Sequence, residues 1–178
     1  MNRKLSMSAQ TMTLICIFAF LVTRLLLGCD RERETPQANL QLGDSAPDFA
    51  AKDLDGNVTV LSSLRGSPVI LRFFETQCRF CKADTPIFNE FYKKHQDKGV
   101  KILYVGSFYE NEKALRAFTG ELGTTFPVIL DNGAKLADQY GIRAYPQTVF
   151  LSPEGKILAA LLGAVSEAEL TEILGKYL

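Results

Sequence analysis

A single C-x-x-C motif, Cys78 and Cys81, lies at the point where a predicted strand ends and a predicted helix begins. Residues 68–74 (PVILRFF) are apolar and rich in β-favouring side chains, which indicates a short buried strand. Residues 79–98 then carry apolar side chains at helical spacing. This order predicts a fold that displays the cysteine pair at the end of a sheet strand, on the first turn of a helix.

The alternation of strands and helices continues to the C-terminus. Further strands are predicted over residues 100–105, 126–130, 147–152 and 156–162, and further helices over residues 110–122, 134–140 and 166–178. The last helix should begin with a capping box formed by Ser166 and Glu169. Residues 48–60 suggest a small hairpin that turns at residues 55–57. We therefore predict an α/β fold with a central mixed β-sheet flanked by helices and an N-terminal β-hairpin extension.

Composition narrows the possible partners. The chain of 178 residues is 47% hydrophobic and 22% charged, as ordinary globular proteins are. Its 20 basic residues equal its 20 acidic residues, so no basic excess favours a nucleic-acid partner, and none is predicted.

The N-terminus has the layout of an export signal. Arg3 and Lys4 precede the apolar run of residues 14–22, which is shorter than the roughly 20 residues that a spanning helix needs. Residues 26–29 (LLGC) resemble a bacterial lipoprotein box. In such a box Cys29 would become the lipidated first residue of the mature protein.

An uncleaved membrane anchor is the main alternative, because Arg24 is an unusual charge so close to the box. We predict a signal or anchor over residues 1–28, a flexible tether over residues 29–41 and a folded domain over residues 42–178. Asp30, directly after the box, resembles a signal for retention at the inner membrane. Both alternatives place the domain in the cell envelope, on the extracytoplasmic (periplasmic) face of that membrane.

The four cysteines separate into two groups. Cys16 and Cys29 lie in the targeting region, which leaves Cys78 and Cys81 as the pair in the predicted domain. The loop that this pair closes is too small to staple a fold, so the pair serves chemistry or metal binding. A zinc site needs four ligands, and the only histidine, His95, follows fourteen residues later in a polar helical stretch, where we expect it to face solvent. No metal site is predicted.

The position of the pair suits thiol chemistry. Cys78 at the helix start faces unpaired backbone N–H groups and the positive end of the helix dipole, which stabilise a thiolate. Cys81 lies one turn further on the same face, at a separation that suits a disulfide. We predict that Cys78 attacks a substrate disulfide and that Cys81 resolves the mixed disulfide, which leaves a Cys78–Cys81 disulfide and requires no organic cofactor.

Short motifs frame the cysteine pair on both sides. They are residues 43–49 (GDSAPDF), the turn at residues 55–56, residues 61–66 (LSSLRG), residues 78–81 (CRFC) and residues 141–148 (GIRAYPQT). In this combination residues 40–178 resemble the membrane-tethered thiol-disulfide oxidoreductases of the TlpA/ResA type, a thioredoxin-fold branch of the AhpC/TSA-related redoxins. The resemblance implies a thioredoxin-like fold and a reductase that exchanges disulfides.

The resemblance also implies a substrate site and partners. The proline that matches Pro146 is cis in the family and packs beside the cysteines, and its missing N–H leaves the backbone of Tyr145 free to pair with an incoming peptide. Tyr145 and Pro146 are therefore the predicted substrate-binding residues. The implied partners are exported protein thiols and disulfides, such as apocytochrome c before haem attachment, and a membrane electron donor of the DsbD/CcdA kind.

The chain departs from the family pattern around the cysteines. Gln77 stands where Trp is common, and Phe80 where Pro is common. Arg79 between the cysteines is a cation that should favour a thiolate and raise the reduction potential. An exposed arginine with little effect is the alternative. Asp84 matches a position at which the family often carries Glu, and we predict that its carboxylate shuttles the proton that activates Cys81. A solvated acid that merely suits the helix dipole is the alternative.

Arg72 interrupts the apolar strand before the motif, where a buried charge must find a partner. We hypothesise that it pairs beneath the active site with Asp84 or with Glu75. Glu75 itself lies in the turn that leads to Cys78 and is expected to shape the electrostatics of that thiol.

Two other functions compete with disulfide exchange. A peroxiredoxin-like peroxidase would use Cys78 on peroxide, but such enzymes carry Thr three residues before the cysteine, whereas Thr76 lies two before. A metallochaperone would need a further ligand such as His95 beside the two thiols. Disulfide exchange in the reducing direction is the function that we predict.

Overall fold

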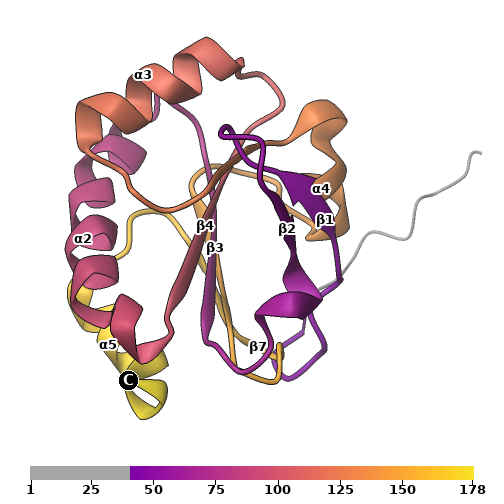
Figure 1. Cartoon of the computed structure of the whole chain (residues 1–178), viewed down its shortest axis with the longest axis vertical. Helices are drawn as coiled ribbons and strands as arrows, with labels where there is room; N and C mark the ends of the chain where they lie inside the picture. Colours follow the sequence, from indigo (N-terminus) through magenta and orange to yellow (C-terminus); the bar gives the residue numbers. More distant parts are fainter. Residues whose placement is uncertain (1–40) are drawn as a thin grey trace, which may run out of the picture. The chain divides into compact units, whose positions relative to one another are not determined.

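The computed structural model describes residues 41–178 (Figure 1). The predicted signal or anchor segment, Cys29 and all but the last residue of the predicted tether lie outside this range. Within it, every helix is too short or too polar to cross a bilayer.

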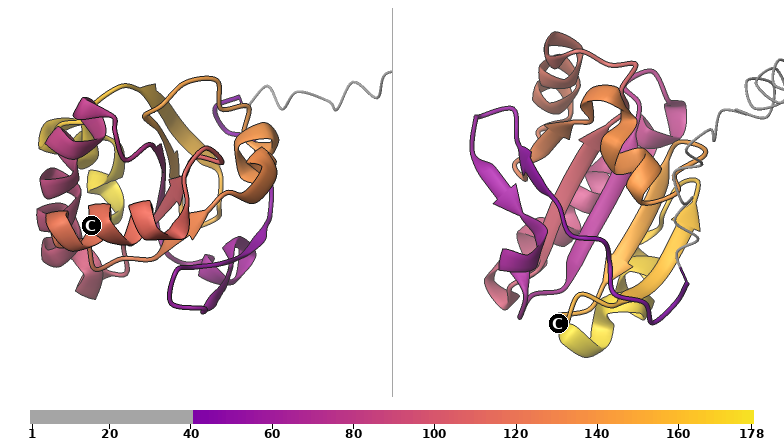
Figure 2. Two further views of the ribbon diagram at one scale, coloured as in Figure 1. Left: turned by 90° about the horizontal axis from the view of Figure 1, so that it is seen from above. Right: turned by 90° about the vertical axis from the view of Figure 1, so that its right-hand side faces the viewer.

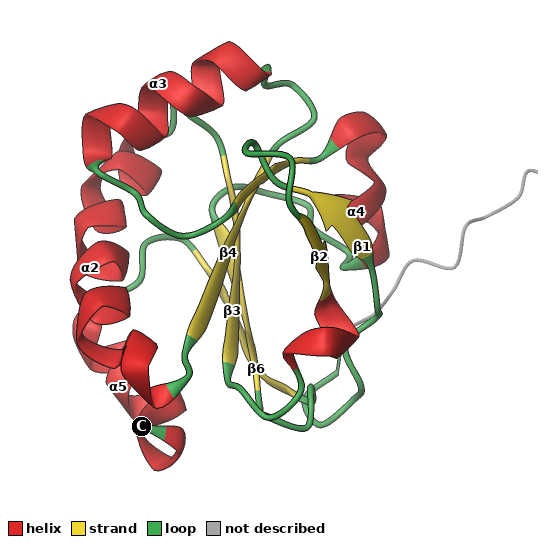
Figure 3. Cartoon of the chain, in the orientation of Figure 1, coloured by secondary structure: helices red, strands yellow, loops and turns green. Residues whose placement is uncertain are grey.

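A five-stranded mixed sheet forms the centre of the fold (Figure 3). The strands are β3 (Val69–Phe74), β4 (Lys101–Gly106), β5 (Val128–Leu130), β6 (Gln147–Leu151) and β7 (Ile157–Leu162), in the spatial order β5-β4-β3-β6-β7. β3 and β5 run parallel to β4, whereas β6 runs antiparallel to β3 and to β7. The predicted mixed sheet is therefore confirmed, with the strand before the cysteines at its centre.

Helices cover both faces of the sheet (Figure 2). They are α2 (Arg79–His95), α3 (Glu112–Leu122), α4 (Lys135–Gln139) and α5 (Glu167–Leu174). Ile70 and Phe74 of β3 pack with side chains of α2, α3 and α5, while Leu71 and Phe73 pack with α4 on the opposite face. Burial on both faces explains why every residue of β3 except Arg72 is apolar, in place of an alternation of apolar and polar residues.

The N-terminal hairpin is a separate two-stranded antiparallel sheet of β1 (Ala50–Lys52) and β2 (Val58–Val60). Its turn is held by the Asp53 carboxylate, which accepts from the backbone N–H groups of Asp55 at 3.0 Å and Asn57 at 2.8 Å. Gly56 adopts a φ of 88°, a conformation that side chains disfavour. The hairpin and its turn are as predicted.

The C-terminal helix also begins as predicted, because Ser166 and Glu169 form both halves of a capping box. The α-helix ends at Leu174, and a 3₁₀ turn (Gly175–Tyr177) follows. The predicted helix of residues 166–178 is therefore an α-helix followed by a 3₁₀ turn.

The prediction for His95 is wrong. His95 is only 7% exposed, and its ring centroid lies 4.6 Å from that of Phe91. The two residues are four apart and share one face of α2, so the polar neighbours of His95 hid its inward orientation. Burial lowers the pKa of His95, and Lys98 and Lys94 lower it further. Fourteen residues of helix place it roughly 21 Å from Cys81 along the axis, too far for a shared metal site.

Candidate active site

Cys78 is the N-cap residue of α2. Its Sγ accepts a hydrogen bond from the backbone N–H of Cys81, with 3.3 Å between nitrogen and sulfur. The N–H of Cys78 in turn donates to the carbonyl of Glu75 at 3.2 Å and closes the turn after β3. Cys78 is half-buried, and both cysteines are free thiols. The Cys78 sulfur therefore lies at the positive end of the α2 dipole and accepts a backbone N–H.

Cys81 lies in a different environment, one turn into the helix. Its side chain is 1% exposed and belongs to the core beneath α2. Burial raises the pKa of Cys81, the neighbouring Cys78 raises it further, and Arg72 acts in the opposite direction. Cys81 is therefore a protonated thiol at neutral pH until a base removes its proton.

Alkylation should report this difference directly. We expect iodoacetamide at neutral pH to label Cys78 and leave Cys81 unmodified in the folded reduced protein, as read by peptide mass spectrometry. Because the pKa of Cys81 is raised, its labelling should increase only in strongly alkaline solution. Both cysteines should react in urea, which is the control for intrinsic reactivity. Equal labelling in the folded state would contradict the asymmetry.

Arg72 and Asp84 form a buried ion pair beneath the cysteines. Arg72 is fully buried and Asp84 is 2% exposed. This pairing was one of the two hypotheses, and Glu75 is not the partner. Burial raises the pKa of Asp84, while Arg72 and the Val165 N–H, which donates to Oδ2 at 3.0 Å, oppose that shift.

The guanidinium of Arg72 connects several elements. Its Nη1 donates to the Thr148 hydroxyl of β6 at 2.6 Å and to the Gly163 carbonyl after β7 at 3.0 Å. Its Cζ lies 5.1 Å from the centroid of the Phe88 ring. The Arg72 guanidinium therefore links β3 to α2, to β6 and to the connection between β7 and α5. The second carboxylate oxygen of Asp84, Oδ1, has no hydrogen-bond partner within residues 41–178.

Pro146 lies at the same end of the sheet as the cysteine pair. The Tyr145–Pro146 peptide bond is cis, as predicted. Gln147 pairs with Phe73 across β6 and β3, so Pro146 is adjacent to the last residue of β3. The Pro146 carbonyl accepts from the Gly163 N–H at 2.8 Å. No backbone hydrogen bond within residues 41–178 engages Tyr145.

The remaining predicted residues occupy the rim of the site. Arg79 is exposed, and its guanidinium carbon lies 4.6 Å from the centroid of the Phe80 ring. Glu75 is half-buried in the turn before Cys78. No three or more His, Cys, Asp or Glu side chains in the described part of the chain gather as metal ligands would.

The sequence did not predict one contact that fixes the turn between β3 and Cys78. The N–H and hydroxyl of Thr76 donate to the Glu110 carboxylate at 2.7 and 3.0 Å. The two residues are 34 apart in sequence, and nothing local in the pattern indicates that they meet. The Thr76 hydroxyl is thereby committed to Glu110, so this geometry gives no support to the peroxidase alternative.

This arrangement defines a class of protein. A central strand leads into a helix capped by the first cysteine of C-x-x-C, and a cis-proline directly precedes the neighbouring strand, as in the thioredoxin fold. The model of the AhpC/TSA family matches residues 42–160, and the chain belongs to that family.

Relatives agree with this assignment. Thiol-disulfide oxidoreductase ResA of Bacillus anthracis is 33% identical over 137 residues, covering 77% of this chain and 79% of the relative. ResA of Bacillus subtilis is 34% identical over 126 residues, covering 71% and 70%. A DsbE-type thiol:disulfide interchange protein from Chlorobium tepidum superposes with a TM-score of 0.71 at 27% identity, covering 78% and 98%. The chain is a thiol-disulfide oxidoreductase.

Proposed function

We propose that the protein is a reductase of the cell envelope in which Cys78 is the nucleophile and Cys81 the resolving thiol. The Cys78 thiolate attacks a substrate disulfide, forms a mixed disulfide and displaces the first substrate thiolate. Cys81 then loses its proton and attacks the Cys78 sulfur, which releases the second substrate thiolate. Two electrons pass to the substrate, and a Cys78–Cys81 disulfide remains.

The observation that carries this proposal is the asymmetry of the pair. Cys78 is half-exposed at the start of α2, while Cys81 is buried and hydrogen-bonded to it through its backbone N–H. A substrate disulfide can reach the first sulfur and not the second. The order of attack follows from access, and the raised pKa of Cys81 delays its own attack until the mixed disulfide has formed.

Asp84 is the proposed base for that second step. It lies three residues after Cys81 on α2, so the two side chains share one helix face. Its pKa is raised by burial, which makes the carboxylate a better proton acceptor, and its Oδ1 has a lone pair that no group in residues 41–178 occupies. Arg72 holds the other oxygen and so fixes the orientation of the carboxylate.

Replacement of Asp84 should slow the second step selectively. With a chromogenic aromatic disulfide, Cys78 attack releases the first coloured thiolate and Cys81 attack releases the second. We expect Asp84→Asn to leave the first phase near the wild-type rate and to slow the second about 100-fold, with a rate that increases with pH as hydroxide replaces the base. Asp84→Glu is the matched control and should restore much of the second phase. Equal slowing of both phases would contradict this role.

Tyr145 and Pro146 are the proposed peptide-binding residues. Pro146 offers no N–H, and its carbonyl is already paired with Gly163, so an extended substrate would pair with the unengaged backbone of Tyr145. This position lies beside the end of β3, from which the chain leads to Cys78. A substrate strand held there would present its disulfide to the exposed sulfur.

The proposed location is the periplasmic face of the inner membrane, with the protein attached through a lipid on Cys29. Export is supported by the apolar run and the lipoprotein-like box in the sequence. The proposed substrates are exported protein disulfides such as that of apocytochrome c, and the proposed electron source is a membrane donor of the DsbD/CcdA kind. Metabolic labelling with palmitate, lost in Cys29→Ser, tests the attachment.

The direction of electron flow is tested by the redox state in cells. Cells that express the chain are quenched in acid and treated with a maleimide that changes gel mobility. A reductase is recharged by its donor, so we expect Cys78 and Cys81 to be mostly reduced at steady state and to become oxidised when the donor is removed. A pair that is mostly oxidised with the donor present would contradict the reducing direction.

A further inference from the structure

Two aromatic side chains project from the loop that follows β4. Phe108 is 41% exposed and Tyr109 is 76% exposed, and their ring centroids lie 3.9 Å apart. They occupy the tip of a turn in which the Glu110 N–H donates to the Ser107 carbonyl at 3.0 Å. We call Phe108 and Tyr109 the aromatic tip.

The aromatic tip is attached to the segment that carries the nucleophile. On one side, the Ser107 N–H donates to the Phe74 carbonyl at 2.9 Å, at the end of β3. On the other side, the Glu110 carboxylate accepts from the N–H and hydroxyl of Thr76. Phe74 and Thr76 are four and two residues before Cys78. The turn is therefore fixed to the loop that precedes the reactive sulfur.

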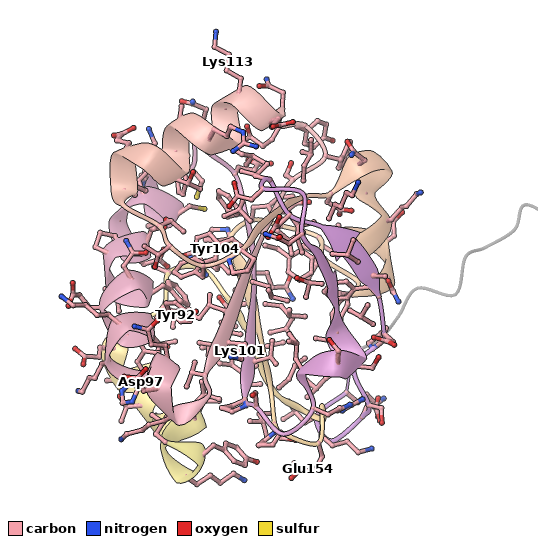
Figure 4. All side chains as sticks on the ribbon, in the orientation of Figure 1. Tyr92, Asp97, Lys101, Tyr104, Lys113 and Glu154 are labelled. Atoms are coloured by element: carbon pink, nitrogen blue, oxygen red, sulfur yellow. The ribbon has the colours of Figure 1, made fainter. Side chains whose placement is uncertain are left out.

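The location is the active-site end of the molecule. Parallel strands β3 and β4 end at the same edge of the sheet, and α3 starts at Glu112, three residues after Tyr109. Lys113, in the first turn of α3, marks this end in Figure 4, opposite the turn that contains Glu154. Phe74, the last residue of β3, pairs with Gly106 of β4 on one side and lies beside Pro146 on the other. The turn with the aromatic tip and the proposed peptide site therefore flank the same end of β3.

The two exposed rings contribute little to core packing, so stability of the fold does not explain why they are aromatic. Binding of another molecule does. A paired, pre-ordered aromatic surface binds apolar side chains at a low cost in conformational entropy. Reduction of a protein disulfide brings a polypeptide onto the surface around Cys78, and the aromatic tip is fixed to the loop that precedes Cys78. The occupant is therefore a substrate chain rather than a nucleic acid or a small ligand.

We propose that the aromatic tip selects substrates, by binding a bulky apolar side chain close in sequence to the cysteine under attack, in an unfolded exported polypeptide. An unfolded chain offers bulky apolar side chains that a folded protein mostly buries. This inference rests on the proposed exchange reaction at Cys78 and adds a specificity element to it.

The test compares three disulfide substrates. Two are peptides joined to glutathione through their single cysteine, one with Trp two residues after the cysteine and the other with Ala there. The third is bis(2-hydroxyethyl) disulfide, a small disulfide without an aromatic ring. We expect the wild type to reduce the Trp peptide about tenfold faster than the Ala peptide at low substrate concentration. In Phe108→Ala/Tyr109→Ala that preference should disappear, while the rate on the small disulfide and the reduction potential stay unchanged.

Val58→Ala is the matched control, because Val58 is 61% exposed on the separate hairpin and should leave all three rates unchanged. An equal loss on the small disulfide in the double variant would overturn the proposal, because the tip would then only position the Cys78 loop. A wild type without preference between the peptides would also overturn it. Failure of the wild type to reduce even the small disulfide would refute the exchange reaction itself, so the two failures are distinct.

Discussion

Cys81→Ser is expected to convert the protein into a trap for its substrates. With serine at this position the Cys78 thiolate can still attack a disulfide, but no second thiol releases the mixed disulfide. Covalent complexes should therefore accumulate on non-reducing gels and dissolve in dithiothreitol, and turnover of a protein disulfide should decrease at least 1,000-fold. Mass spectrometry of the complexes from envelope extracts identifies the substrates.

Cys78→Ser is the matched control, since it removes the accessible sulfur and keeps the buried one. We expect neither turnover nor covalent complexes from this variant. Complexes formed by Cys78→Ser and absent from Cys81→Ser would reverse the assigned order of attack. Rapid peroxide consumption by Cys81→Ser would instead favour the peroxidase alternative.

Arg72→Met is expected to have the largest effect on stability. It removes the partner of Asp84 and leaves a buried carboxylate, and loss of one member of such a pair costs about 3–5 kcal/mol. The unpaired Asp84 escapes part of this cost by taking up a proton, so the loss should be smaller in acid than at neutral pH. Urea unfolding of the reduced protein at several pH values measures both effects.

Two further variants complete that test. Arg72→Met/Asp84→Leu removes both charges and should recover most of the lost stability, because an apolar pair needs no partner. Arg79→Met removes an exposed arginine and should change the free energy of unfolding by no more than about 0.5 kcal/mol. If Arg72→Met and Arg79→Met had equal effects, the buried ion pair would not stabilise the fold as we describe.

The sequence contained enough information for the architecture and for the cysteine pair. The strand before Cys78 and the helix after it have strong periodicity, and a charge within that strand implied a buried partner for Arg72. The choice between Asp84 and Glu75 could not be made, because it depends on which helix face packs on the sheet. On that packed face Asp84 reaches the guanidinium, whereas Glu75 remains in the turn.

The sequence pattern could not predict the contacts between residues far apart in the chain. Thr76 and Glu110, and Arg72 and Thr148, meet only because the sheet brings β3 beside β4 and β6. For His95 the local pattern was misleading. Its polar neighbours in sequence indicated an exposed side chain, but the ring packs against Phe91 and is buried. The expected effect of Arg79 on the thiol stays a prediction. Its guanidinium is exposed and lies over the Phe80 ring, where solvent weakens the action of its charge.

The equilibrium reduction potential of the Cys78–Cys81 pair tests the central claim most directly. Arg79 is exposed and Asp84 neutralises Arg72, so no unpaired buried cation among residues 41–178 favours the reduced dithiol. We therefore predict reversible two-electron behaviour in dithiothreitol and glutathione buffers, with a potential of about −250 mV or lower, in the range of thioredoxin. A potential of about −120 mV, as for the oxidant DsbA, or failure to form the disulfide, would contradict a reductase that works through this pair.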